Sequence, residues 1–387
     1  MSAPEHTTNS REGIHLGRIA GVPIILAYSW FIIAALTVIM FGPVLQRGMP
    51  HLGAGAYLVA FSYSVLLLLS VLAHELAHAL TARIFGWPTE KIVLNLWGGH
   101  TQFDVFTATP GKSVVVALAG PAANFILAGG AWLFVSTANP SGVAGVLANI
   151  FVWANFVIAI FNVLPGIPLD GGRIVESIVW KTTGSHERGT IAAGWAGRII
   201  VVGILLWFVV LPLLRGDGLD FSFGIISILV AWFLWSGASA AINHAKMRLR
   251  LPAISAASLS VPAIGVPNSA TVADVLRMND GGSLAVVLCA PDGKPQGVVD
   301  DAALAGVPAQ SQASTPVTAV SFALSPGAYV PGAAAGEDLV HYLAKLEGRD
   351  YAVIDDAGRV TGLLRQQTVV SAITGKTVGK RNNQARR

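Results

Sequence analysis

Long apolar runs separated by short polar segments dominate the first 250 residues. Six such runs cover residues 24–40, 55–81, 113–135, 143–164, 199–214 and 221–242. An α-helix rises ~1.5 Å per residue, so about 20 apolar residues cross a hydrocarbon core of ~30 Å. All but the shorter fifth run come close to that length. The pattern therefore predicts six membrane-spanning helices.

Two segments depart from this helical pattern. Residues 91–97 and 100–106 alternate between apolar and polar side chains around Gly98 and Gly99, which predicts a β-hairpin between the second and third spans. The fourth span is broken at its end by Pro165, Gly166 and Pro168, before a short helix expected over 172–180. Irregular backbone at membrane depth is tolerated only where protein or a water-filled cavity covers it.

After Arg250 the long apolar runs stop and an internal repeat begins. Residues 285–299 and 352–364 both contain an apolar strand pattern, a glycine turn and a second strand pattern. Helical patterns at 271–278 and 336–346 precede the two copies. This part of the chain is therefore expected to be a soluble α+β module of two repeats.

Composition agrees with a membrane protein. Hydrophobic residues make up 53% of the chain and charged residues only 12%. The net charge of +4 does not indicate nucleic-acid binding, because the basic residues fall in loops and in the tail rather than in one patch. The lone Cys289 excludes a disulfide within the chain and a thiolate metal site. No cleavable signal is evident, so the first apolar run is expected to stay as an anchor.

Loop charges predict the orientation in the membrane. Only Arg47 and Arg215 lie on one side. The other side carries Arg11, Arg18, Arg83, Lys91, Lys112, Arg173, Lys181, Arg188, Arg198, Lys246, Arg248 and Arg250. By the positive-inside rule we expect a multi-pass protein of the cell membrane with both termini in the cytoplasm.

The second span contains a His-Glu-x-x-His sequence. His74 and His78 lie four residues apart, so on a helix they project from one face and can hold one metal ion. In this motif the glutamate, here Glu75, is the general base that takes a proton from water activated by the metal. Ionisable residues at membrane depth are costly and mark function. The alternative is an unusual polar contact between helices.

A zinc site of this kind needs a third protein ligand and one open position. Asp170 lies in the broken end of the fourth span, at the same membrane face as His74 and His78, and is our predicted third ligand. The alternative is an N-cap for the short helix that follows. Asp104, in the predicted hairpin, is the nearest rival carboxylate. We therefore expect one Zn²⁺ per chain.

The motifs together resemble the site-2 protease family of intramembrane zinc metalloproteases, peptidase family M50. The resemblance rests on the His74 to His78 motif, the Gly-Pro-Ala-Ala-Asn run that ends at Asn124, and Asn-x-x-Pro-x-x-Pro-x-Asp-Gly from Asn162 to Gly171. It covers roughly residues 14–180. It implies zinc held by His74, His78 and Asp170, with Glu75 as base, in a six-helix protease core.

The resemblance also implies an activity, regulated intramembrane proteolysis. The substrate would be a membrane protein such as an anti-sigma or pro-sigma factor, cut near the cytoplasmic face. The family motifs place Asn124 at the substrate or the oxyanion, with a helix-to-helix hydrogen bond as the equal alternative. They also suggest that Asn162 braces the break near Asp170. An unwound substrate could pair with the hairpin near Gly98 and Gly99, unless the hairpin is only a connector on the membrane surface.

The repeated module looks like a tandem CBS pair, which places the chain in the branch of the family with C-terminal CBS domains. CBS pairs bind adenine nucleotides in many proteins, but Asp300 and Arg365 stand near the places of the usual ligand-contacting Thr and Asp. Packing or homodimerisation through the module is therefore an equal alternative. The expected domains are an arm at 1–21, the protease core at 22–250, CBS domains at 251–310 and 311–375, and a basic tail at 376–387.

Two other functions are compatible with polar residues in a helix bundle. A metal-binding transporter would more often show paired repeats in its membrane half, and none is evident. A catalytically inactive tether for the CBS module would not need His74, Glu75, His78 and Asp170 together. A Glu75→Gln variant distinguishes the three, because only a protease would lose its activity and keep its zinc.

Overall fold

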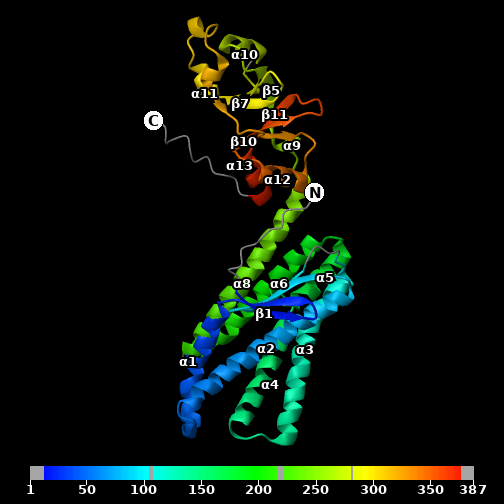
Figure 1. The fold of residues 1–387 in the computed structure, drawn as a ribbon, viewed down its shortest axis with the longest axis vertical. Coiled ribbons are helices and arrows are strands. Elements are labelled where there is room, and N and C mark those ends of the chain that lie inside the picture. Colours follow the sequence, from blue (N-terminus) through cyan, green and yellow to red (C-terminus); the bar gives the residue numbers. More distant parts are fainter. Residues whose placement is uncertain (1–12, 104–107, 217–220, 280–281, 376–387) are drawn as a thin grey trace. The chain divides into compact units, whose positions relative to one another are not determined.

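A computed structural model describes residues 13–103, 108–216, 221–279 and 282–375 (Figure 1). Asp104 and the basic tail at 376–387 lie outside the described residues. The chain divides into two compact units, Met1–Ala245 and Lys246–Arg387.

The described residues of the first unit contain six helices that are long and apolar enough to cross a membrane. They are α1 (Trp30–Gly48), α2 (Gly55–Ile84), α3 (Pro110–Ala138), α4 (Gly142–Val163), a continuous helix from α6 (His186–Leu205) through η2 (Leu206–Val210) to α7 (Leu211–Arg215), and α8 (Phe221–Arg250). Large apolar side chains such as Ile126 (74%) and Leu214 (79%) are exposed, which suits contact with lipid. The chain is therefore a multi-pass membrane protein, as predicted.

A four-stranded sheet accompanies the helices, in the order β1-β2-β3-β4. The strands are β1 (Ile14–Ile19), β2 (Val22–Leu26), β3 (Thr89–Asn95) and β4 (Gly98–Phe103). Strands β2 and β3 are parallel, and the other two pairs are antiparallel. The predicted hairpin is confirmed as β3 and β4, but its turn lies at Leu96 and Trp97, because Gly98 and Gly99 belong to β4 and pair with β3. Strands β1 and β2 were not predicted.

The first apolar run is divided between a strand and a helix, which corrects the predicted start of the first span at residue 24. Its opening residues form β2, whose Ile24 and Leu26 pack with Trp30 of α1 and with Ile92 and Leu94 of β3. Because these side chains are all buried, the strand is as apolar as the span that follows. Hydropathy alone therefore could not separate the two.

The fifth span is longer than predicted, since α6 begins at His186 rather than near 199. Arg198, expected in a loop, lies inside this helix. Its guanidinium is 4.7 Å from the ring centre of Trp195 and 4.8 Å from that of Trp235, and its Nη2 donates to Ser239 Oγ at 3.0 Å. These aromatic contacts compensate part of the cost of a charge within the span.

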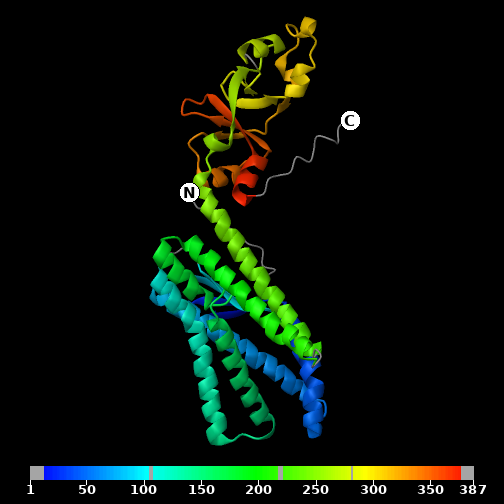
Figure 2. The same ribbon diagram turned by 180° about the vertical axis from the view of Figure 1, so that it is seen from behind.

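Helices α3 and α4 form an antiparallel pair that runs side by side in both views (Figures 1 and 2). The chain leaves α4 at Val163 and passes through an irregular loop into α5 (Gly172–Thr183), a short helix that packs on α6. The predicted break in the fourth span therefore corresponds to the loop at 164–171.

The second unit contains the two predicted repeats in one seven-stranded sheet, ordered β8-β7-β6-β5-β11-β10-β9. The first repeat has β5 (Val261–Pro267), α10 (Val272–Met278), β6 (Ala285–Cys289), β7 (Pro295–Val299) and α11 (Asp301–Ala305). The second has β9 (Tyr329–Pro331), α12 (Gly336–Lys345), β10 (Asp350–Ile354), β11 (Val360–Arg365) and α13 (Gln366–Thr374). The remaining elements are η3 (Leu251–Ala253), α9 (Ala256–Leu259), η4 (Ala309–Ser311), η5 (Val317–Val320) and β8 (Ser321–Ala323).

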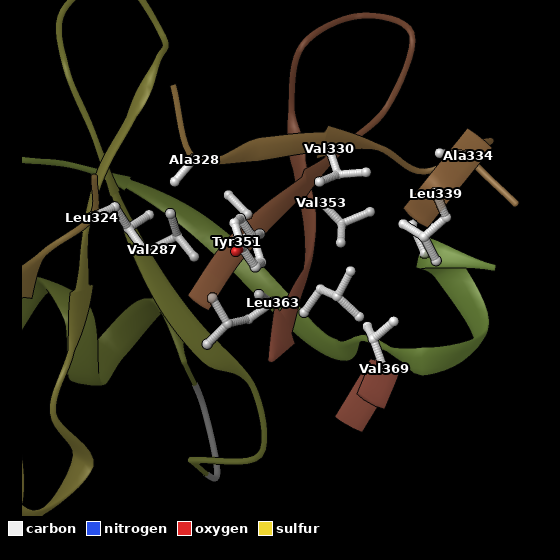
Figure 3. Close-up of a cluster of buried hydrophobic side chains, with 14 of the residues drawn as sticks. Val287, Leu324, Ala328, Val330, Ala334, Leu339, Tyr351, Val353, Leu363 and Val369 are labelled. Carbon is white, nitrogen blue, oxygen red and sulfur yellow. The ribbon is translucent and has the colours of Figure 1, made fainter. Parts of the chain in front are cut away.

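Strand directions match between the repeats. Strands β5 and β6 are parallel, and so are β9 and β10. Strands β6 and β7 are antiparallel, and so are β10 and β11. Tyr351 is fully buried in the core of this unit, between Leu324, Val287 and Leu363 (Figure 3). The α+β architecture predicted for the C-terminal module is confirmed.

Candidate metal centre

Helix α2 carries the two histidines and the glutamate on its buried side. His74, Glu75 and His78 are 6%, 7% and 7% exposed, well inside a helix whose outer face is apolar. The spacing of four residues places the two imidazoles one turn apart, with ring centres 4.7 Å from each other. Their Nε2 atoms approach to 3.1 Å.

The loop after α4 brings Asp170 to these rings from 92 and 96 residues away in the chain. Asp170 Oδ2 lies 2.9 Å from His74 Nε2 and 3.2 Å from His78 Nε2. The three side chains thus form one group that could hold a metal ion. The structure brings together the three ligands that the sequence predicts.

The Nδ1 atoms of His74 and His78, which face away from Asp170, both make hydrogen bonds. His78 Nδ1 is 2.7 Å from the carbonyl oxygen of Val116, which can only accept, so this nitrogen carries the hydrogen. His74 Nδ1 is 2.5 Å from Asn124 Oδ1, also an acceptor. Neutral rings in these tautomers direct two Nε2 lone pairs at the Asp170 carboxylate. Such a convergence of lone pairs requires a cation between them, or protons taken up by the rings.

The distances between the three donor atoms also suit a zinc ion. Ligands at ~2.0–2.2 Å around a tetrahedral ion are about 3.3 Å from one another. The three donor atoms here are 2.9 to 3.2 Å apart. Two imidazole nitrogens and one carboxylate leave a fourth position free, which is the pattern of catalytic rather than structural zinc sites.

Gly120 of α3 provides the space for this group. A β-carbon at this position would lie 2.4 Å from His78 Nε2 and 2.6 Å from His74 Nε2, closer than any real contact. The absence of a side chain therefore lets the backbone of α3 pass directly beside the ligand atoms. This explains the glycine of the Gly-Pro-Ala-Ala-Asn run, to which no role was assigned from the sequence.

Backbone contacts hold the Asp170 loop in position. The amide of Gly171 donates to the carbonyl oxygen of Asn162 at 2.6 Å, and the amide of Ile167 donates to the carbonyl oxygen of Ala193 in α6 at 3.1 Å. A β-carbon on Gly171 would lie 2.2 Å from the carbonyl oxygen of Val163, so only glycine fits this position. Asn162 thus braces the loop through its backbone.

Glu75 is covered by the edge strand β4. Thr101 Oγ1 donates to Glu75 Oε2 at 2.7 Å, and a β-carbon on Gly99 would lie 2.6 Å from Glu75 Cγ. Gly98, the first residue of β4 after the turn, differs: a β-carbon there would meet nothing within 4 Å, and its φ of +117° lies in the region that favours glycine. Thr101 was missed from the sequence, where it is one polar position in an alternating strand.

The side chain of Asn124 is fully buried and both ends of its amide are engaged. Oδ1 contacts His74, and Nδ2 donates to Asn155 Oδ1 at 2.8 Å. These contacts favour the helix-to-helix alternative over a direct contact with substrate. Asn155, like Thr101, was not singled out from the sequence.

A second buried cluster fixes α5 to α6, close to the Asp170 loop. Glu176 is 3% exposed; its Oε1 accepts from Thr190 Oγ1 at 2.7 Å and lies 2.8 Å from His186 Nε2, and Arg173 pairs with Oε2 at 3.3 Å. Burial raises the pKa of the Glu176 carboxyl, but contacts with His186, Arg173 and Thr190 outweigh it and the pKa lies below its usual value of 4.5.

We expect Glu176→Gln to lower stability and flatten its pH dependence. The folded-state pKa is depressed, so the charged carboxylate contributes stability that is present above pH ~4.5 and lost as pH falls through the lowered value. Thermal unfolding in detergent from pH 3 to 7 should show a variant less stable at neutral pH by about 1–3 kcal/mol, with a smaller loss in acid. Glu347→Gln, at an exposed position, is the control. Parallel pH profiles for wild type and Glu176→Gln would contradict this account.

Comparison with known proteins gives consistent matches. The family model described as peptidase family M50 matches residues 62–145 and 136–206. A protein of Synechocystis sp., named as a zinc metalloprotease, is 33% identical over 256 residues. That alignment covers 64% of this chain and 65% of the relative, so the chain spans slightly less than two thirds of its relative's length.

Two solved structures are similar to parts of the chain. The site-2 protease from Methanocaldococcus jannaschii is 28% identical, with 59% of this chain and 94% of that chain covered and a TM-score of 0.41. The CBS domain of a bacterial CNNM/CorC family Mg²⁺ transporter is 19% identical, with 36% and 88% covered and a TM-score of 0.26. The family match runs through α2, α3, α4 and the loop that carries Asp170, so this part of the chain, which holds the metal centre, is similar to peptidase family M50.

Proposed function

We propose that this chain is an intramembrane zinc metalloendopeptidase that cuts a membrane protein near the cytoplasmic face. The observation that carries the proposal is the convergence of His74, His78 and Asp170, whose Nε2 and Oδ2 atoms lie within 3.2 Å of one another, with Glu75 next to His74 on α2. The match of residues 62–145 and 136–206 to the model of peptidase family M50 supports it. In this account the three converging side chains hold one zinc ion.

The chemistry assigns a separate role to each side chain. A zinc ion at this site supplies a Lewis acid that polarises a carbonyl group and acidifies water. Glu75 accepts the proton from water and later passes it to the leaving amine. Thr101 donates to Glu75 Oε2, which orients the carboxylate. The buried position of the group limits access by bulk water.

We propose that the substrate binds as an added strand on β4. A helical substrate hides its carbonyl groups in internal hydrogen bonds, so it must unwind before hydrolysis. β4 ends the four-stranded sheet among the described residues and contacts Glu75 through Gly99 and Thr101. An extended segment paired with its free edge would therefore lie next to the catalytic carboxylate.

Gly99 is a poor position at which to test this strand pairing, because bulk there would displace Glu75 directly. Photocrosslinking gives a cleaner test. p-Benzoylphenylalanine at His100 of β4, in a Glu75→Gln background, should form adducts with membrane proteins. The same probe at Leu16, 50% exposed on β1 at the opposite edge, should not. Equal yields of the same adducts at both positions would exclude strand addition on β4.

We further propose the orientation and division of the chain. Both termini lie in the cytoplasm, as the loop charges predict, with 22–250 as the protease core and 251–310 and 311–375 as two CBS domains. Asp300 caps helix α11, with Oδ1 accepting from the amides of Ala302 at 2.9 Å and Ala303 at 3.2 Å. This capping role supports packing or dimerisation rather than nucleotide binding for the module.

A comparison of membrane proteomes tests the proposed activity. Cells that contain the chain or its Glu75→Gln variant should differ in fragments cut within or beside a transmembrane segment, and the uncut proteins should accumulate with the variant. Identical proteomes would contradict a peptidase. Zinc-dependent transport that persists in the variant would indicate a transporter instead.

A further inference from the structure

Four buried polar side chains form a line of hydrogen bonds that starts at the metal centre on α2, passes through α3 and α4 and returns to α2 one turn away. His74 and Ser70 come from α2, Asn124 from α3 and Asn155 from α4. Asn124 and Asn155 are 0% exposed and Ser70 is 1% exposed. Polar groups so deep in an apolar bundle are costly unless each finds a partner. Here they bond to one another in an unbroken line.

The hydrogen bonds along this line all run from donor to acceptor in the same order, and Ser70 at the end of the line fixes that order. Ser70 Oγ donates its only hydrogen to the carbonyl oxygen of Leu66 at 2.9 Å, so it can only accept from Asn155. Asn155 Nδ2 donates to Ser70 Oγ at 3.0 Å and to the carbonyl oxygen of Phe151 at 2.9 Å. Both hydrogens of this amide are therefore used, and its oxygen must face Asn124.

The direction continues to the metal centre. Asn124 Nδ2 donates to Asn155 Oδ1 at 2.8 Å, so Asn124 Oδ1 faces His74 Nδ1 at 2.5 Å. An amide oxygen can only accept, which places the hydrogen of the neutral His74 ring on Nδ1. The lone pair of Nε2 is then free on the side of His78 and Asp170. Partners of this kind orient a ligating histidine and fix its tautomer.

We propose that Asn155 and Ser70 are positioning residues for the metal centre, which hold Asn124 in the orientation that keeps His74 Nε2 free to bind zinc. The inference rests on the proposed zinc site. Neither residue touches the ligand group itself. Without Asn155 the amide of Asn124 can rotate and turn its NH₂ group toward His74, which would favour the tautomer that cannot bind metal through Nε2.

The chain contains a control on the same helix for each position. Asn149 lies on α4 like Asn155, but it is exposed and its Nδ2 donates to the carbonyl oxygen of Gly145 within that helix. Ser64 is as buried as Ser70, and its hydroxyl likewise donates to its own helix, to Ala60. Neither of these two hydrogen bonds connects to the metal centre.

Metal affinity of the purified full-length protein tests the proposal without reference to activity. Asn155→Leu should weaken Zn²⁺ binding about 10–100-fold in competition with a chelator and change the absorption spectrum of bound Co²⁺. Ser70→Ala, which removes one acceptor of Asn155, should act in the same direction by a few-fold. Asn149→Leu and Ser64→Ala should match the wild type.

Several outcomes would overturn the positioning role. It fails if folded Asn155→Leu and Ser70→Ala bind Zn²⁺ as the wild type does, or if the control variants weaken binding equally. If Asn155→Leu does not fold, the Zn²⁺ affinity of Ser70→Ala is compared with that of Ser64→Ala, and equal affinities contradict the positioning role. If the wild-type chain binds no zinc, both the positioning role and the proposed zinc site are wrong. Normal zinc binding without any proteolysis would instead contradict only the peptidase.

Discussion

Replacing Glu75 with glutamine is expected to slow peptide-bond hydrolysis about 10²–10⁴-fold while one zinc ion stays bound. Glutamine has nearly the same shape and can still accept a hydrogen bond from Thr101, so the packing against β4 is kept. It cannot take up a proton from water. Cleavage of a membrane protein identified from the proteomes, together with metal content, measures both effects.

Glu90 provides a matched control for this change, because it is exposed on β3 of the same sheet. Glu90→Gln should leave both the rate and the zinc content unchanged. Loss of zinc from the Glu75→Gln protein would mean that Glu75 holds the metal rather than acting as a base. Retention of full activity would exclude it from proton transfer.

Gly120→Ala is expected to have the largest effect on metal binding of any single added methyl group. The new β-carbon would lie 2.4 Å from His78 Nε2 and 2.6 Å from His74 Nε2, so both rings must move away from Asp170. Zinc affinity should fall at least about 100-fold, the upper end for a lost contact around a metal ligand. Activity should be lost with the metal.

Gly129→Ala is the control on the same helix, since a β-carbon there meets nothing within 4 Å. Alanine favours helix over glycine, so this variant should fold and bind zinc normally. If Gly120→Ala binds zinc as tightly as Gly129→Ala does, the ligand atoms do not lie where the structure places them.

The ligand group could be predicted because its signals are local in the sequence. His74 and His78 lie one helical turn apart, and Asp170 follows a Pro and Gly break at the same end of a span. The loop charges predict that these segments lie at one membrane face. With few ionisable residues at that depth, topology alone was enough to bring the carboxylate and the histidines together.

The supporting contacts could not be predicted, because they depend on how separate helices and strands pack. Asn155 is one polar residue in an apolar helix, and nothing near it in the sequence indicates Asn124 or Ser70 as partners. Thr101 is one residue of an alternating strand, and its contact with Glu75 depends on where β4 crosses α2. Gly120 acquires its role only once the histidine rings lie beside it.

Hydropathy also misplaced two boundaries, for physical reasons. β2 is as apolar as a membrane span because its side chains are buried in the protein. Arg198 lowered the apparent hydropathy of the fifth span, although Trp195 and Trp235 pack against its guanidinium. Hydropathy counts residue types, whereas both cases depend on what the side chain contacts.

X-ray absorption at the zinc edge of the purified full-length chain tests the central claim most directly. We expect one zinc ion per chain with two imidazole nitrogens and a carboxylate oxygen at ~2.0–2.2 Å, and a loss of zinc in Asp170→Ala. A folded chain that takes up no zinc, or an Asp170→Ala protein with an unchanged zinc spectrum, would contradict the account.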